Sequence, residues 1–281
     1  MYSTTSIFII VLFAALCHAS WSLAIKSHRE SLTIMGMTSI TEIIVFLPLV
    51  FFVPLPSAQI WFFILISVAL HGLYRLVVVY SYQFGDLSFV YPIARGGSAL
   101  LITLITFLLL IDEISIMGLL GIFTVCIGIF LISRSQKKFI NKKAFILAVI
   151  TSILIATYSL IDGIGVRKSE NGLSYIFWML LLNGVPVLIY ILLKKKKVWP
   201  NISKDILFNG FSAGLLAILS YGLVVWSMQH LEIAYVSSIR ESSIVIATFM
   251  GVFLLGEKAA AKRVISSMIV LLGVTILYFE I

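Results

Sequence analysis

Long apolar runs follow one another along almost the whole chain, and only short connections separate them. A helix needs about 20 residues to cross ~30 Å of hydrocarbon, and the runs predict ten such helices. We place these helices near residues 6–25, 32–53, 59–82, 87–110, 115–133, 143–166, 173–193, 206–229, 233–255 and 262–280. The composition agrees, because 61% of the residues are hydrophobic and only 11% are charged, against about 25% charged in soluble domains.

These runs favour an all-α integral membrane protein. An open sheet cannot cross lipid, since its edge amides would lack hydrogen-bond partners, and the runs are too long and too uniformly apolar for barrel strands. We therefore expect a multi-pass protein of the cell membrane. The first charged side chain, Lys26, comes after the first run, so we expect residues 6–25 to be a retained helix rather than a signal peptide.

The formal net charge of +8 comes mainly from Lys and Arg residues in the connections. Basic residues beside apolar spans contact lipid headgroups and set orientation, so we expect this charge to meet the lipid bilayer and no nucleic acid. Most of it follows odd-numbered helices, which predicts both termini outside. The cysteines, Cys17 and Cys126, lie in separate apolar runs and support neither a disulfide framework nor a metal site.

A basic stretch at residues 133–143 divides the predicted helices five and five, and the two halves resemble each other. Three segments of the first half have counterparts in the second half, at an offset of about 144 to 146 positions. Residues 85–90 correspond to residues 231–236, and the Tyr-Pro-Ile-Ala-Arg stretch ending at Arg95 corresponds to Ser-Ser-Ile-Arg ending at Arg240. Asp112-Glu113 corresponds to Gly256-Glu257. Copies with an odd number of spans insert in opposite orientations. We therefore predict two inverted five-helix repeats, residues 1–135 and 143–281, joined by a basic linker at residues 136–142.

Residues 85–133 carry Gly-Asp-Leu-Ser, Val-Tyr-Pro-Ile-Ala-Arg-Gly and an Asp-Glu before a second Gly-rich helix, and they resemble the EamA domain of the drug/metabolite transporter superfamily. Residues 231–278 resemble it again, so the resemblance covers the chain as two tandem domains. It implies a ten-helix basket of inverted repeats that exports or imports metabolites such as amino acids, nucleosides or amphipathic drugs. It also implies both termini in the cytoplasm, opposite to the charge pattern, and the orientation stays open between the two.

Ionisable side chains inside a span are costly unless they are paired or hydrated, so each is a candidate for function. They are His18, Glu42, His71, Arg75, Arg95, Asp162, Arg240 and Glu241. His71, Tyr74 and Arg75 share one helical face. This face predicts either a solute-facing stripe or a packing stripe in which Arg75 snorkels or pairs with Glu42.

Arg95 and Arg240 occupy equivalent positions in the predicted repeat, and we expect them near its pseudo-symmetric centre. There they could bind a carboxylate or phosphate through bidentate contacts, although Arg95 could instead only hold helices together. Adjacent residues lie ~100° apart around a helix, so Arg240 and Glu241 need different partners. We expect one of them to face a cavity and the other to hold a neighbouring helix.

Asp162 shares a helical face with Tyr158 and could bind a substrate ammonium group or accept a coupling proton; it could also lie solvated at the helix end. Glu241 and His18 are the other proton-coupling candidates, though a lone satisfied histidine is the commoner case. Aromatic side chains can line a cavity for flat or cationic solutes or form interfacial belts. The predicted substrate-binding set is Arg95, Arg240, Glu241, Asp162, Tyr74, His71, Tyr91, Tyr158, Trp21 and Tyr221.

The sequence contains no Walker loop, nucleophile elbow, zincin helix or paired cysteine set, so we expect no catalytic residue, metal or cofactor. We predict a secondary carrier, monomeric or homodimeric, that moves a small organic metabolite such as an amino acid or related zwitterion across the cytoplasmic membrane by alternating access. The alternative is an integral membrane enzyme acting on a lipid or a small substrate. A sensor or a channel is a third class.

Overall fold

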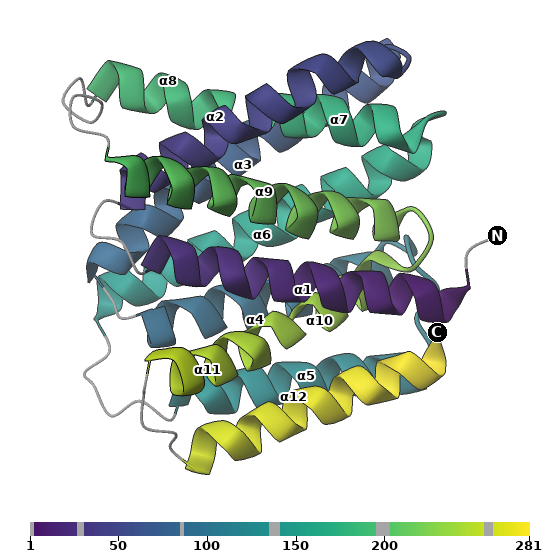
Figure 1. Cartoon of the computed structure of the whole chain (residues 1–281). Coiled ribbons are helices and arrows are strands. Elements are labelled where there is room, and N and C mark those ends of the chain that lie inside the picture. The colour runs from purple at the N-terminus through teal and green to yellow at the C-terminus, as the bar shows by residue number, and fades with distance from the viewer. Residues whose placement is uncertain (1–2, 27–30, 85–86, 135–140, 195–202, 256–260) are drawn as a thin grey trace.

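The computed structural model in Figure 1 describes residues 3–26, 31–84, 87–134, 141–194, 203–255 and 261–281. These residues form α-helices and one short 3-10 helix, with no strand in the described ranges. Up to residue 134 the elements are α1 (Thr4–Lys26), α2 (Ser31–Leu49), η1 (Val50–Phe52), α3 (Ala58–Phe84), α4 (Leu87–Leu108) and α5 (Ile116–Arg134). From residue 142 they are α6 (Lys142–Lys168), α7 (Gly172–Asn183), α8 (Val185–Lys194), α9 (Lys204–Met228), α10 (Ile233–Arg240), α11 (Ser242–Leu255) and α12 (Ala261–Glu280). The all-α prediction is confirmed.

Within the described ranges, six stretches are long and apolar enough to cross a membrane, and three more apolar helices are shorter. Large apolar side chains such as Phe62, Phe107 and Phe208 point outward from the bundle and are exposed. Exposed apolar side chains of this kind occur on nearly every helix. Large apolar surfaces are rare on water-soluble monomers, whereas hydrocarbon solvates them. α1 begins and α12 ends at the same end of the bundle (Figure 1), as an even number of crossings requires.

The ten predicted helices are found in the described ranges, and two of them, predicted at residues 173–193 and 233–255, are each interrupted at one residue. Gly184 separates α7 from α8, and a side chain there would meet the backbone oxygen of Ser39 on α2 at 2.7 Å. Pro186 follows and donates no backbone hydrogen bond. Glu241 separates α10 from α11; its N–H bonds the oxygen of Ser238 at 3.1 Å, in the tighter 3-10 pattern.

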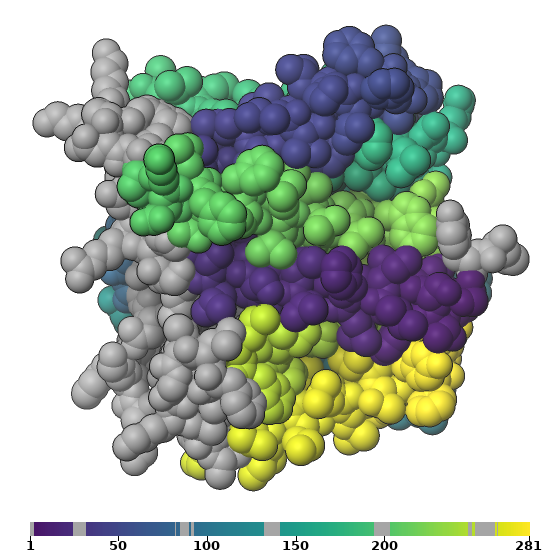
Figure 2. Space-filling view, in the orientation of Figure 1, coloured from purple at the N-terminus to yellow at the C-terminus, as the bar shows by residue number. Residues whose placement is uncertain are grey.

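Helices that are distant in the sequence lie side by side. α5 packs along α12, α3 and α4 pack on α6, and α1 and α2 pack on α9. Figure 2 shows one face of this arrangement, with α1 lying between α9 and the pair α11 and α12. One apolar cluster includes residues of α1, α4, α5, α10 and α12, and a second includes residues of α2, α3 and α7. α6 and α9 contribute to both clusters, and polar side chains of these helices lie inside the bundle.

Candidate functional site

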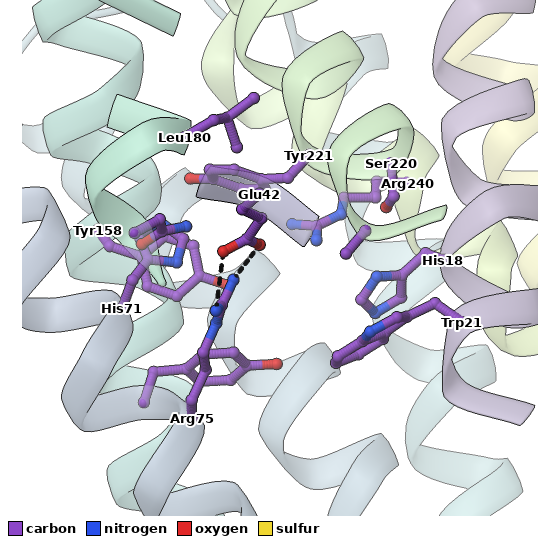
Figure 3. A pocket seen from close by; sticks show the side chains of 13 residues that line it. His18, Trp21, Glu42, His71, Arg75, Tyr158, Leu180, Ser220, Tyr221 and Arg240 are labelled. Atoms are coloured by element: carbon purple, nitrogen blue, oxygen red, sulfur yellow. Dashed lines mark hydrogen bonds and ion pairs between the residues drawn. The ribbon is translucent and has the colours of Figure 1, made fainter. Parts of the chain in front are cut away.

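A small cavity of about 50 Å³ lies inside the helix bundle (Figure 3). The glutamate–arginine pair at its centre separates His71 and Tyr158 on one side from His18 and Arg240 on the other. Seven helices, α1, α2, α3, α6, α7, α9 and α10, contribute its walls. The lining residues are His18, Trp21, Glu42, His71, Tyr74, Arg75, Tyr158, Leu180, Asn183, Ala217, Ser220, Tyr221 and Arg240.

The central pair is Arg75 of α3 and Glu42 of α2. Nη2 of Arg75 donates to Oε1 of Glu42 at 2.5 Å, and Nη1 donates to Oε2 at 3.1 Å. Nη1 also lies 3.3 Å from the Ser39 hydroxyl. This bidentate geometry neutralises both charges in a buried place, so the pairing alternative left open by the sequence is the one present.

Asp162 of α6 is fully buried, so it is not a solvated helix-end residue. Its carboxylate accepts hydrogen bonds from the hydroxyls of Tyr175 (2.8 Å) and Tyr221, and lies 3.2 Å from Nε2 of His71. Asp162 itself does not line the cavity, but His71 and Tyr221 do. Asp162 is therefore connected to the cavity through its hydrogen bonds with His71 and Tyr221.

The four rings of His71, Tyr74, Tyr158 and Tyr221 form an aromatic cluster on the same side of the cavity. His71 stacks on Tyr158 with 3.9 Å between ring centroids, and Tyr221 meets His71 edge-on at 4.7 Å. Tyr74 meets Tyr158 at 5.4 Å. These contacts bring together four predicted site residues from α3, α6 and α9 and hold the His71 ring beside Asp162.

Arg95 and Glu241 form a second buried ion pair away from the cavity wall. Nη2 of Arg95 lies 2.8 Å from Oε1 of Glu241, and Nε donates to Oε2 at 3.0 Å. The pair joins α4 to the α10–α11 junction. As helix geometry predicted, Glu241 and Arg240 face different partners: Glu241 pairs with Arg95 and Arg240 lines the cavity.

Arg240 is buried, and its guanidinium carbon lies 5.3 Å from the centre of the Tyr221 ring. No carboxylate of the described residues lies within ion-pair distance of it, and its Nε has no hydrogen-bond partner there. Tyr221 thus has Arg240 against its ring face and Asp162 at its hydroxyl.

Three further cavity-lining groups are buried without a hydrogen-bond partner among the described residues: Nε1 of Trp21, Oδ1 of Asn183 and the hydroxyl of Ser220. Buried polar atoms in native structures are nearly always bonded, so such atoms around a cavity are available to a ligand. Asn183 and Ser220 were not singled out from the sequence, because neutral polar residues in spans are common. Asn183 did carry one signal, its place directly before the Gly-Val-Pro break.

The remaining predicted residues are His18, Trp21 and Tyr91. His18 and Trp21 of α1 line the cavity with their rings 5.2 Å apart. The side chain of Tyr91 lies outside the described part of the structure. Within the described ranges, no group of three or more His, Cys, Asp or Glu residues could hold a metal ion.

A separate polar cluster lies at the end of α6, outside the cavity. Arg167 pairs with Asp112 at 2.8 Å and donates to the backbone oxygens of Met228 and Leu231 at 2.7 and 2.6 Å. The other oxygen of Asp112 accepts the N–H of Ala234 at 3.2 Å. Arg167 therefore ties α6 to the α4–α5 and α9–α10 connections.

Glu232 lies in the α9–α10 connection beside this cluster. Burial raises the pKa of its carboxyl above the ordinary value of 4.5, and the nearby carboxylates of Asp112 and Glu113 act in the same direction. Its own backbone hydrogen bond and the positive charge of Arg167 oppose this rise. The native structure thus disfavours the charged form of Glu232.

The comparison with protein families agrees with a membrane transporter. Residues 142–279 match the model of the EamA-like transporter family. A comparison with curated proteins finds no match. Among solved structures, 29 chains match; one, described only as "Crystal structure of protein", is 13% identical with a TM-score of 0.79, over 99% of this chain and 98% of its own length. At this identity the likeness shows a shared fold.

Proposed function

Because this chain belongs to the EamA-like transporter family, we propose that it is a secondary carrier for an amino acid or a related zwitterion. The family match and the apolar helices make it a multi-pass membrane transporter of the drug/metabolite transporter superfamily. We place the solute in the cavity of Figure 3 and expect the carrier to open this cavity to each side of the membrane in turn, by alternating access.

Arg240 is the observation that carries the substrate class. Two of the three intramembrane arginines that sequence analysis singled out, Arg75 and Arg95, already hold carboxylates of the protein in two-point contacts. Arg240 instead directs its guanidinium at the cavity wall without such a partner in the described part of the chain. Tyr158 gives this guanidinium a neutral hydrogen-bond partner, but Nε has none among the described residues. A guanidinium binds a carboxylate through paired N–H donors, and a solute carboxylate would supply the acceptor that Nε lacks.

Asn183 and the aromatic rings suit the other end of a zwitterion. Oδ1 of Asn183 is a buried acceptor without a partner in the described residues, so it can accept from an ammonium group. The faces of Trp21 and Tyr74 also line the cavity and attract cations. A site with buried polar groups of both kinds favours a solute that bonds them and rejects an analogue that leaves them unbonded.

The proposal includes two inverted repeats, residues 1–135 and 143–281 with the linker at 136–142, as the basis of alternating access. Reciprocal packing of α5 on α12 supports it. A side chain on Gly128 would meet Val270, and one on Gly273 would meet Val125. Both residues of the first contact map onto the second by a shift of 145 positions. Contacts in which i meets j and j meets i are typical of two-fold symmetry.

The test is counterflow in liposomes that contain the purified protein and a labelled panel of amino acids, nucleosides and amphipathic amines. We expect saturable counterflow of an amino acid and a loss of about 10-fold or more in Arg240→Gln, since a charge-assisted contact is removed. Lys168→Gln at the end of α6 is the matched control and should behave as wild type.

Two results would count against the proposal. Counterflow confined to amines, or absent for every amino acid although the protein is folded, would contradict the substrate class. Amino-acid counterflow that is equally strong in Arg240→Gln and in the control would contradict the site.

A further inference from the structure

His71 is a titratable group that lies between the cavity and the buried carboxylate of Asp162. Its ring lines the cavity, and Nε2 lies 3.2 Å from Oδ2 of Asp162. A carboxylate can only accept, so Nε2 carries the hydrogen of the neutral ring and Nδ1 carries the lone pair. No described residue bonds Nδ1, so a proton can add there without breaking a contact.

The charges inside the bundle show what this proton would change. Arg75 with Glu42 and Arg95 with Glu241 are internally neutral pairs. Among the described residues at or directly beside the cavity, the remaining charges are Arg240 and Asp162, joined through Tyr221. With His71 neutral these two compensate each other. A proton on His71 compensates Asp162 directly and leaves the positive charge of Arg240 to the cavity.

We propose that His71 takes up a proton together with the carboxylate of the solute at Arg240, and that both cross the membrane in the same direction. This inference rests on the proposed function and adds its driving force. An anionic group at Arg240 and a proton at His71 each favour the other, and the coupling is reciprocal. A solute bound through a cation would compete with the proton and move against it.

The surroundings of His71 favour this role over a purely structural one. On its own helix it faces Arg75; from α2 it faces Glu42, from α6 Asp162 and Tyr158, and from α9 Tyr221. Arg75 and Glu42 neutralise each other. Asp162 is then the charged group that acts on the ring and stabilises an added proton, whereas burial of the ring opposes that proton. The stack on Tyr158 fixes the ring plane, so Nε2 stays directed at Asp162.

The experiment measures accumulation in proteoliposomes of the panel amino acid that shows wild-type counterflow, with the membrane potential clamped. An outside pH about two units lower than inside should drive uptake, up to about 100-fold for one proton per neutral zwitterion. We expect His71→Gln to lose this accumulation, and any counterflow that it retains to become independent of pH, because glutamine can donate to Asp162 but does not titrate. His230→Gln, at a histidine two residues after the end of α9 and outside the cavity, is the matched control and should accumulate as wild type.

A second measurement needs no variant. A pH-sensitive dye inside wild-type liposomes should report about one proton entering with each solute molecule. Several results would overturn the inference while leaving the carrier intact: protons that leave as solute enters, accumulation that persists in His71→Gln, or loss of accumulation in His18→Gln alone. Absence of wild-type counterflow would instead refute the proposed function on which the inference rests.

Discussion

Glu241 directs its carboxylate at Arg95, with 2.8 Å between Oε1 and Nη2, across the junction that ends α10 and begins α11. The partner lies 146 positions earlier in the chain, so the pair joins the two halves of the predicted repeat. Both side chains are almost completely buried. The adjacent Arg240 lies on a different side of the helix and lines the cavity.

Neutralising one partner of this pair should destabilise the protein strongly. Glu241→Gln or Arg95→Gln leaves one buried charge without compensation, which typically lowers the free energy of unfolding by about 3–5 kcal/mol. The double variant Arg95→Gln with Glu241→Gln should lose less than the sum of the two. Denaturation of the purified protein in detergent measures all three. Additive losses would show that the two side chains do not interact.

The same double variant separates stability from transport. Neither residue lines the cavity, so the folded double variant should retain counterflow of the wild-type solute. Loss of counterflow in the folded protein would instead support the sequence-based prediction that Arg95 and Glu241 bind the substrate.

Gly128 and Gly273 should be equally intolerant of a side chain. An added Cβ at Gly128 would lie 2.8 Å from the backbone nitrogen of Val270, and one at Gly273 would lie 2.6 Å from that of Val125. Backbone cannot move aside as a side chain can, so Gly128→Ala and Gly273→Ala should each destabilise by about 1–3 kcal/mol. Gly222→Ala is the control, since its nearest contact is the flexible end of Leu180 at 3.3 Å. Unequal losses at the two positions in thermal unfolding would argue against the reciprocal packing.

Glu232 should make stability fall as the pH rises. Burial raises its pKa in the folded protein, so the native state holds this proton more tightly than the unfolded chain does. The stabilisation is fully present below the ordinary carboxyl pKa of 4.5 and is lost as the pH passes the raised value. Glu232→Gln should remove this dependence, so its unfolding midpoint should gain on wild type between mildly acidic and neutral pH. A constant difference between the two proteins over that range would contradict the prediction.

Arg167 should resist replacement by lysine. Its guanidinium serves Asp112 and two backbone oxygens at once, a pattern that a single ammonium group cannot reproduce. Arg167→Lys and Arg167→Gln should both lower the free energy of unfolding, the glutamine variant by about 2–4 kcal/mol because Asp112 is left buried without its cation. Lys168→Gln is the neighbouring control in the same denaturation series. A lysine variant as stable as wild type would show that charge alone is what Asp112 requires.

Much of the fold could be predicted from the sequence because membrane crossing is a local property of the chain. An apolar run of sufficient length becomes a helix in lipid whatever surrounds it, since hydrocarbon offers its backbone no other hydrogen-bond partner. The predicted spans therefore match α1 to α6, α9 and α12 closely. The breaks at Gly184 and Glu241 escaped this reasoning, because they arise where another helix approaches or where a polar side chain finds a distant partner.

The candidate site, like the fold, could be predicted from the sequence only in part. Helix geometry by itself required that Arg240 and Glu241 face different surroundings. Because burying a charge in a membrane is costly, nearly every ionisable group of the cavity could be identified from the sequence as a candidate. Tertiary structure decided the partners: that Arg75 holds Glu42, that Asp162 lies behind His71 and Tyr221, and that Asn183 turns an acceptor to the cavity. Apolar periodicity and length act within one helix, whereas ion pairs depend on which helices pack together and in what register. These ion pairs join residues that are far apart in the chain, so only the packing of the folded bundle determines them.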